Sequence, residues 1–213
     1  MNLDKLQRRA IDDNVEINAD DNIRTVSGYA LKFNTLSCDL GGYLETIAPE
    51  ALDNDILSNS DIFAFINHDE KLGVLARSRF GKGKLLLSID NIGLKYEFKV
   101  SDKSPCHQQL MQYLDDEIIT KSSFSFTVAD YEWVNNEDGT EYVDADGLQR
   151  LIIRKFDRLF DVSPVFEPAY FDTSSEIRKA NEVNNDIINE MNQRKQNKLD
   201  NYYKKIRKKY RLK

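Results

Sequence analysis

The sequence predicts a mainly β, α+β fold: a strongly curved sheet or β-barrel with peripheral helices, followed by a separate C-terminal tail. Many short segments carry the residue types and alternation of strands, and one long segment before the tail has a helical period. Hydrophobic residues make up 40% and charged residues 31% of the chain, which fits a packed core joined to a long solvated segment. With 213 residues, we expect one domain at 1–175 and a basic tail at 176–213.

Strands dominate the first hundred residues, as short runs rich in β-branched, aromatic and aliphatic residues bounded by turn residues. These runs cover 24–33, 43–47, 62–66, 74–80, 85–89 and 94–100. Gly81 and Gly83 flank Lys82 in a segment that predicts a hairpin turn. Pro49 predicts the first turn of a short helix after the second strand.

The period of the sequence changes after Ser104, a candidate helix cap that precedes Pro105. Apolar residues then recur at helical spacing, and they are Leu110, Met111, Leu114 and Ile118. We therefore expect a helix over 105–119. Strand patterns return at 122–128, 131–134 and 148–160. Pro164 and Pro168 are expected to break the extended structure that follows.

The tail differs from the rest of the chain in composition and charge. Residues 176–213 lack Gly and Pro and read as a helix or a helix-prone disordered segment. They contain 12 Lys or Arg against 5 Asp or Glu, whereas the whole chain has a net charge of −6. This asymmetry predicts that the tail meets an acidic partner, nucleic acid or the acidic body itself, or is simply a solvated helix. The acidic body argues against a large nucleic-acid footprint, so we do not expect a nucleic-acid-binding protein.

Several classes of protein are disfavoured by residue counts. Cys38 and Cys106 are too few and too isolated for a disulfide framework or a zinc site, and we expect neither a metal nor a cofactor. Cys106 and His107 are neighbours in a predicted helix, where adjacent side chains diverge, which disfavours a cysteine protease. The sequence shows no signal-peptide pattern and no apolar run of about 20 residues. We therefore expect a soluble protein in a reducing cytoplasm, with no membrane partner.

A histidine at the end of an apolar strand is the first candidate for chemistry. The strand at 62–66 leads to His68, one of two histidines in the chain. By strict alternation, Ile62, Ala64 and Ile66 share its face and would partly desolvate the ring, which favours the neutral form that a general base needs. A structural or exposed histidine is the plainer alternative.

Two serines are candidates for a nucleophile. Phe124 and Phe126 share one face of the predicted strand, and Ser123 and Ser125 share the other. The two hydroxyls stand about 6–7 Å apart along a strand, so only one of them can reach an imidazole. Alternation alone does not choose between them, and both fit an ordinary polar sheet face.

A carboxylate would hold the second ring nitrogen of His68. Asp161 is the stronger candidate, because it stands between Phe160 and Val162, where a carboxylate needs a partner to offset its burial. Asp157 is the reserve, and a turn or capping role for Asp161 is the competing interpretation.

Motifs along residues 23–178 occur together in an order that resembles a known family. They are Val-Ser-Gly-Tyr-Ala at 26–30, Gly-Gly-Tyr-Leu-Glu-Thr-Ile-Ala-Pro-Glu-Ala-Leu at 41–52, Asn-His-Asp at 67–69, Gly-Val-Leu-Ala-Arg at 73–77, Gly-Leu at 93–94, Ser-Phe-Ser-Phe at 123–126 and Asp-Val-Ser-Pro-Val-Phe-Glu-Pro-Ala-Tyr at 161–170. In this order and spacing, the chain resembles the prohead (capsid maturation) proteases of tailed bacteriophages, the HK97-like serine peptidases.

The resemblance implies a role for each candidate. It implies His68 as general base and Ser123, rather than Ser125, as nucleophile. Asp161 stands where the family motif has an acid and is our candidate for the third member, with Asp157 in reserve. The sequence departs from the family pattern at Ser125, where Gly is usual, and at Asp161, where Glu is usual. Glu50 likewise stands where Gly is usual.

The resemblance also implies an architecture and a setting. The family is related to the herpesvirus assemblins, which implies a curved β-barrel ringed by helices that acts as a dimer or a larger oligomer. It implies cleavage of scaffold or major capsid protein arms, and of the protease itself, inside the procapsid in the host cytoplasm. The basic tail would then retain the enzyme by binding an acidic scaffold. The alternative is a catalytically inactive barrel that acts as a scaffold-binding capsid-assembly module.

Overall fold

A computed structural model describes residues 6–11, 15–20, 23–136 and 139–166. The tail predicted at 176–213 lies outside these residues. The strands are β1 (Gln7–Ile11), β2 (Glu16–Asp20), β3 (Ile23–Lys32), β4 (Tyr43–Ile47), β5 (Asp61–Ile66), β6 (Asp69–Arg79), β7 (Lys82–Gly83), β8 (Leu86–Ile89), β9 (Gly93–Lys99), β10 (Ile119–Trp133) and β11 (Gln149–Phe166). The helices are η1 (Pro49–Ala51), α1 (Asn54–Asn59) and α2 (Pro105–Asp115). The mainly β fold with few helices is confirmed.

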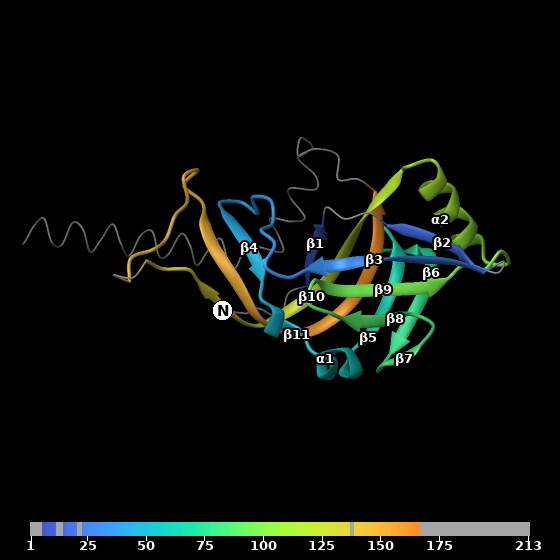
Figure 1. Ribbon diagram of the computed structural model, residues 1–213, viewed down its shortest axis with the longest axis horizontal. Helices are drawn as coiled ribbons and strands as arrows, with labels where there is room; N and C mark the ends of the chain where they lie inside the picture. Colours follow the sequence, from blue (N-terminus) through green and yellow to red (C-terminus); the bar gives the residue numbers. More distant parts are fainter. Residues whose placement is uncertain (1–5, 12–14, 21–22, 137–138, 167–213) are drawn as a thin grey trace, which may run out of the picture.

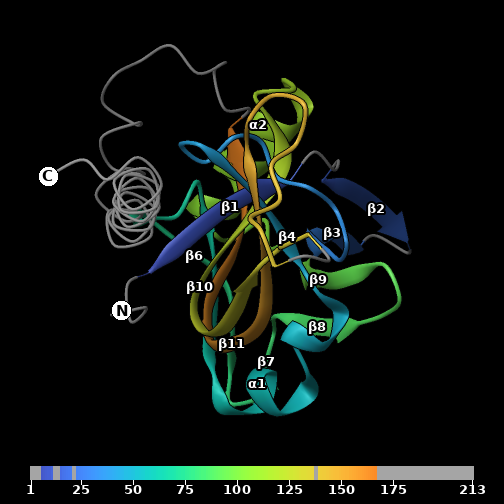
Figure 2. The ribbon, with the colours of Figure 1, turned by 90° about the vertical axis from the view of Figure 1, so that its left-hand side faces the viewer.

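The described strands form two sheets rather than one closed barrel (Figures 1 and 2). The seven-stranded sheet has the order β1-β10-β11-β5-β6-β7, and β4 pairs in parallel with the first part of β11. The four-stranded sheet has the order β2-β3-β9-β8. The prediction of a closed β-barrel is therefore wrong for the described residues. Alternation gives each sheet one apolar face. Two open sheets can bury these faces by packing against each other, so a closed barrel is not required.

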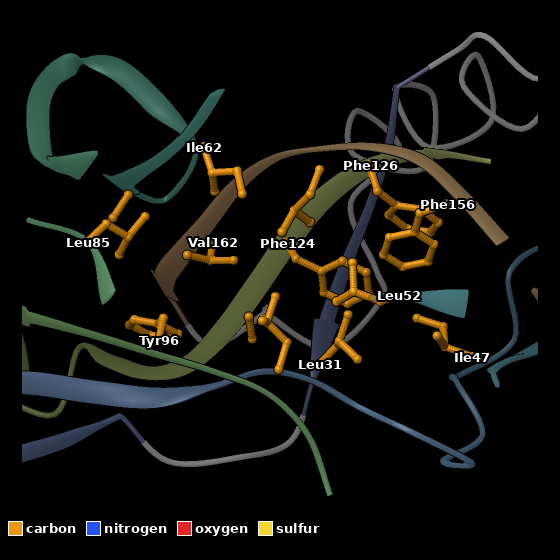
Figure 3. Close-up of a cluster of buried hydrophobic side chains, with 14 of the residues drawn as sticks. Leu31, Ile47, Leu52, Ile62, Leu85, Tyr96, Phe124, Phe126, Phe156 and Val162 are labelled. Carbon is orange, nitrogen blue, oxygen red and sulfur yellow. The ribbon is translucent and has the colours of Figure 1, made fainter. Parts of the chain in front are cut away.

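Side chains from both sheets fill the core (Figure 3). The rings of Phe124 and Phe126 on β10 stack with Phe156 on β11, and the centroids of Phe126 and Phe156 are 4.3 Å apart. Leu31 and Tyr96 contribute from the four-stranded sheet. Because Phe124 and Phe126 point inward, the residues that alternate with them on β10 point to the opposite face of the sheet.

Helices α1 and α2 lie at opposite ends of the sheets (Figures 1 and 2). The helix expected at 105–119 is confirmed as α2, which ends earlier, at Asp115. His107 anchors α2: its Nε2–H donates to the Leu75 carbonyl on β6 at 2.7 Å, and its Nδ1 accepts from the Ser101 N–H at 2.8 Å. Both ring nitrogens of this buried histidine are thus used for structure.

Strand β11 is longer than the sequence indicated, because it continues through Pro164 to Phe166. The fixed φ of proline is compatible with an extended backbone. The Pro164 carbonyl accepts a hydrogen bond from the Asn67 N–H at 2.9 Å, so this part of the strand is held by the neighbouring turn. The expectation that Pro164 ends the extended structure is wrong. Within the described residues, no helix has the length and apolar character needed to span a membrane.

Candidate active site

A two-residue turn between β5 and β6 carries His68. Asn67 and His68 have φ values of 52° and 58°, and Ile66 pairs with Asp69 across the turn. Two consecutive left-handed residues form the tight hairpin turn that matches the twist of antiparallel strands, and asparagine is among the residues that tolerate this conformation best. The local sequence therefore places an imidazole at the tip of a rigid hairpin.

The turn also changes the direction in which His68 points. Ile62, Ala64 and Ile66 are fully buried in the core, whereas the His68 ring contacts Asp161, which pairs with Phe63 on the other face of the sheet. The prediction that the three aliphatic residues share the face of His68 is wrong. Strand alternation stops at Ile66, because the left-handed turn residues reorient the backbone.

Ser123 is the serine that the structure places beside this ring. Its Oγ lies 2.6 Å from His68 Nε2. Ser123 stands on β10 between the buried residues Ser122 and Phe124 and points to the opposite face from them, as alternation predicts; its exposed fraction is only 3%. Of the two serines that alternation left open, Ser123 reaches the imidazole and Ser125 contacts Asp161 instead.

Asp161 occupies the other side of the ring. Its Oδ1 lies 2.5 Å from His68 Nδ1. Asp157, the reserve, is exposed, and its Oδ2 accepts a hydrogen bond of 3.1 Å from Thr127 Oγ1. The structure therefore brings His68, Ser123 and Asp161 together from three different elements and leaves Asp157 outside the group.

Two further serines surround the Asp161 carboxylate. Ser163 Oγ donates to Oδ1 at 2.7 Å and accepts from the Phe65 N–H at 3.3 Å, while Ser125 Oγ donates to Oδ2. Neither serine was predicted to bind this carboxylate. The available signal was alternation, since Ser125 shares a face with Ser123, and Ser163 shares a face with Asp161.

Hydrogen bonding keeps Asp161 ionised despite its burial. Burial on its own raises the pKa of the Asp161 carboxyl group, but the hydrogen bond and charge of His68 and the bonds from Ser125 and Ser163 outweigh it, so the pKa lies below its ordinary value. An ionised carboxylate accepts the Nδ1–H of His68 and leaves the Nε2 lone pair directed at Ser123. This is the tautomer that can take a proton from a serine hydroxyl.

Strand β1 adds a backbone group to the site that the sequence did not indicate. The Arg9 carbonyl oxygen lies 2.7 Å from Ser123 Oγ, so the single hydroxyl proton has two possible acceptors, Arg9 O and His68 Nε2. A buried ion pair fixes β1 at this point, with Arg9 Nε 2.8 Å from Glu45 Oε1 on β4. The nucleophile is therefore held from two sides.

The chemistry of these contacts is that of acyl transfer by a serine hydroxyl with an imidazole as base. In the described part of the chain, no group of three or more His, Cys, Asp or Glu side chains is arranged to hold a metal ion.

Comparisons with known proteins are informative at two levels. A family model described as Caudovirus prohead serine protease matches residues 9–186. A search of curated proteins finds no match. Among solved structures, the capsid assembly protease gp21 of bacteriophage T4 is similar, with a TM-score of 0.50 over 76% of this chain and 98% of that chain. The identity between the two is 9%, so this likeness concerns the fold alone.

Proposed function

Because the chain belongs to the caudovirus prohead serine protease family, we propose that it is an endopeptidase in which Ser123 is the nucleophile, His68 the general base and Asp161 the group that orients His68. The observation that supports this assignment is the continuous series of contacts from Asp161 Oδ1 to His68 Nδ1, at 2.5 Å, and from His68 Nε2 to Ser123 Oγ, at 2.6 Å.

The proposed reaction has two halves. Ser123 Oγ attacks the scissile carbonyl carbon while His68 Nε2 takes the hydroxyl proton, and the imidazolium then gives this proton to the leaving amine. A water molecule then gives a proton to His68 Nε2 and attacks the acyl carbon. The imidazolium returns this proton to Ser123 Oγ as the bond to the acyl group breaks, which releases the acid product and restores the Ser123 hydroxyl. Throughout, the Asp161 carboxylate stabilises the positive charge that develops on His68.

We propose the setting of this reaction from the family. The substrates are the scaffold or the scaffold-like arms of the major capsid protein, together with the protease itself, and cleavage takes place inside the procapsid in the host cytoplasm. The protease domain spans 1–175 and self-associates as a dimer or a larger oligomer. The tail at 176–213 retains the enzyme in the procapsid through an acidic partner.

Labelling with a fluorophosphonate tests the nucleophile, and mass spectrometry of scaffold incubated with the protein tests cleavage. We expect label on Ser123 and cut products with the wild type, and neither with Ser123→Ala. His68→Ala should abolish detectable cleavage, and Asp161→Asn should lower kcat by about 10⁴-fold, the loss seen when the carboxylate no longer holds the imidazole in the correct tautomer.

Ser122→Ala is the matched control. Ser122 is adjacent in sequence but points inward, where its Oγ lies 2.9 Å from Tyr96 Oη, so this variant should be labelled like the wild type. A folded wild-type protein that neither takes up the label nor cuts scaffold would overturn the proposal and favour the inactive scaffold-binding module.

A further inference from the structure

The Oδ2 atom of Asp161, which does not bond His68, accepts a hydrogen bond from Ser125. Residues 125 and 161 stand directly opposite each other in the register of β10 and β11, and Ser125 Oγ donates to Asp161 Oδ2. The other oxygen, Oδ1, receives His68 Nδ1–H and Ser163 Oγ–H. Ser125 is fully buried and Asp161 has an exposed fraction of 5%, so water cannot readily replace the hydrogen bond between them.

We propose that Ser125 is a positioning residue for the catalytic carboxylate, and that residues 125 and 161 form a size-matched pair across the two strands. This inference rests on the proposed function, because it assigns a role in the same site. Ser125 acts on catalysis through Asp161 and His68.

Rotation of the carboxylate is the motion that Ser125 restricts. The terminal torsion of an aspartate is broad and has only weak intrinsic preferences. The bonds from His68 and Ser163 both reach Oδ1, so without Ser125 nothing holds Oδ2 against a turn about the Cβ–Cγ bond, which would misalign the acceptor for Nδ1–H. A second bond to Oδ2 from the neighbouring strand fixes that plane, and hydrogen bonds to an ionised, buried acceptor are the strong ones.

The hydroxyl of Ser125 also limits the length of the acidic side chain that fits at position 161. Since Ser125 Oγ already contacts Oδ2, the extra methylene of a glutamate at 161 would drive its carboxylate into the space that Ser125 Oγ occupies. Glycine at 125 removes this hydroxyl and its Cβ and makes room for the longer side chain. A change at either position should therefore be rescued by the complementary change at the other.

Kinetics of Ser125→Ala test the positioning role. We expect kcat to fall by about 10–100-fold, the range for loss of one hydrogen bond to a buried charged group, with KM changed less than about twofold because Ser125 is fully buried. Thr127→Val is the matched control: Thr127 Oγ1 bonds the Asp157 carboxylate between the same two strands, and its loss should leave kcat unchanged.

A double-mutant cycle tests the size match. Asp161→Glu should lose more activity than Ser125→Gly, the other single variant of the cycle, and the double variant Ser125→Gly/Asp161→Glu should recover at least about tenfold in kcat over Asp161→Glu alone. Circular dichroism checks that each variant is folded. A double variant no better than Asp161→Glu would overturn the size match.

A readout other than activity separates this inference from the proposed function. The NMR resonance of the His68 Nδ1 proton, which we expect downfield because Nδ1 bonds a carboxylate, reports the His68–Asp161 hydrogen bond. We expect this resonance to shift or broaden in Ser125→Ala and to stay unchanged in Thr127→Val. An unchanged resonance with wild-type kcat overturns the positioning role. If the wild type proves inactive, the peptidase proposal fails, and the resonance alone decides whether Ser125 orients the carboxylate.

Discussion

Asp161 is a buried carboxylate that hydrogen bonds on both of its oxygens, and this affects the stability of the protein as well as its chemistry. Burial on its own raises the pKa of Asp161, and the bonds and charge from its neighbours lower it further than burial raises it. A carboxyl group with a lowered pKa in the folded state stabilises the fold at any pH above its unfolded pKa of about 3.8. That contribution is lost as the pH falls through the lower folded value.

We therefore expect the free energy of unfolding of the wild type to fall more steeply below pH ~4 than that of Asp161→Asn, which has no titrating group at this position. Denaturant titrations of both proteins at pH 7, 5, 4 and 3 measure the difference. A constant difference across this range would contradict the lowered pKa of Asp161.

Alternation predicted which serines share a face of β10, but not which residues of the neighbouring strand they pair with. The sequence presented Ser125 and Asp161 as two separate departures from a family pattern. The register of β10 and β11 shows that they are cross-strand partners. Ser125 and Asp161 are 36 residues apart in the chain, and the register that pairs them depends on several irregularities between β10 and β11 that no local pattern reveals.

Among the elements, the Asn67–His68 turn is the one whose backbone bears most directly on the site. An alanine at 67 would have to adopt a left-handed φ, at a cost of about 1–2 kcal/mol. We expect Asn67→Ala to lower the free energy of unfolding by about 1 kcal/mol and also to lower kcat, because the turn positions His68.

Asn34→Ala is the control for the turn, since Asn34 has a similar φ of 55° but lies outside the active site. It should show the same loss of stability with unchanged kcat. Chemical denaturation and steady-state kinetics of both variants separate strain from function. Equal kcat values in the two variants would show that the conformation of residue 67 does not position the imidazole.

Strand β1 carries one half of a buried ion pair, between Arg9 and Glu45 on β4. Arg9 and Glu45 have exposed fractions of 9% and 3%. Breaking such a pair leaves an uncompensated charge, so we expect Arg9→Met to lower the free energy of unfolding by about 3–5 kcal/mol. The double variant Arg9→Met/Glu45→Met should lose much less, because both charges are removed together. Denaturant unfolding of the single and double variants measures this difference, and equal losses would contradict it.

The same ion pair explains why β1 was not predicted from the sequence. Gln7 and Arg9 are buried polar residues on a short strand, and a pattern search for apolar alternation passes over them. Strands with alternating apolar residues, such as β5 and β9, were predicted close to their observed bounds. The missing information is tertiary, since Glu45 is 36 residues away from Arg9.

Both sheets contribute to one hydrophobic core, and the stacked rings of Phe124, Phe126 and Phe156 lie in it. Truncation of a buried aromatic ring removes apolar area and leaves a cavity, so we expect Phe126→Ala to destabilise the protein by about 3–5 kcal/mol. Both sheets should still unfold in one transition, because they share the core.

Fluorescence of Trp133, the single tryptophan of the chain, follows the seven-stranded sheet, and hydrogen exchange of β9 amides follows the other. Coincident midpoints in the two measurements would support a common core. Separate midpoints would show that the sheets are independent units.

Strand β10 has β1 on one side and β11 on the other where it carries Ser123. As long as β1 stays paired, a peptide ligand cannot add to β10 as a further strand beside Ser123. The ligand must then approach from the outer face of the sheet. Compact electrophiles should therefore inhibit this enzyme better than extended peptidomimetics designed to add a strand.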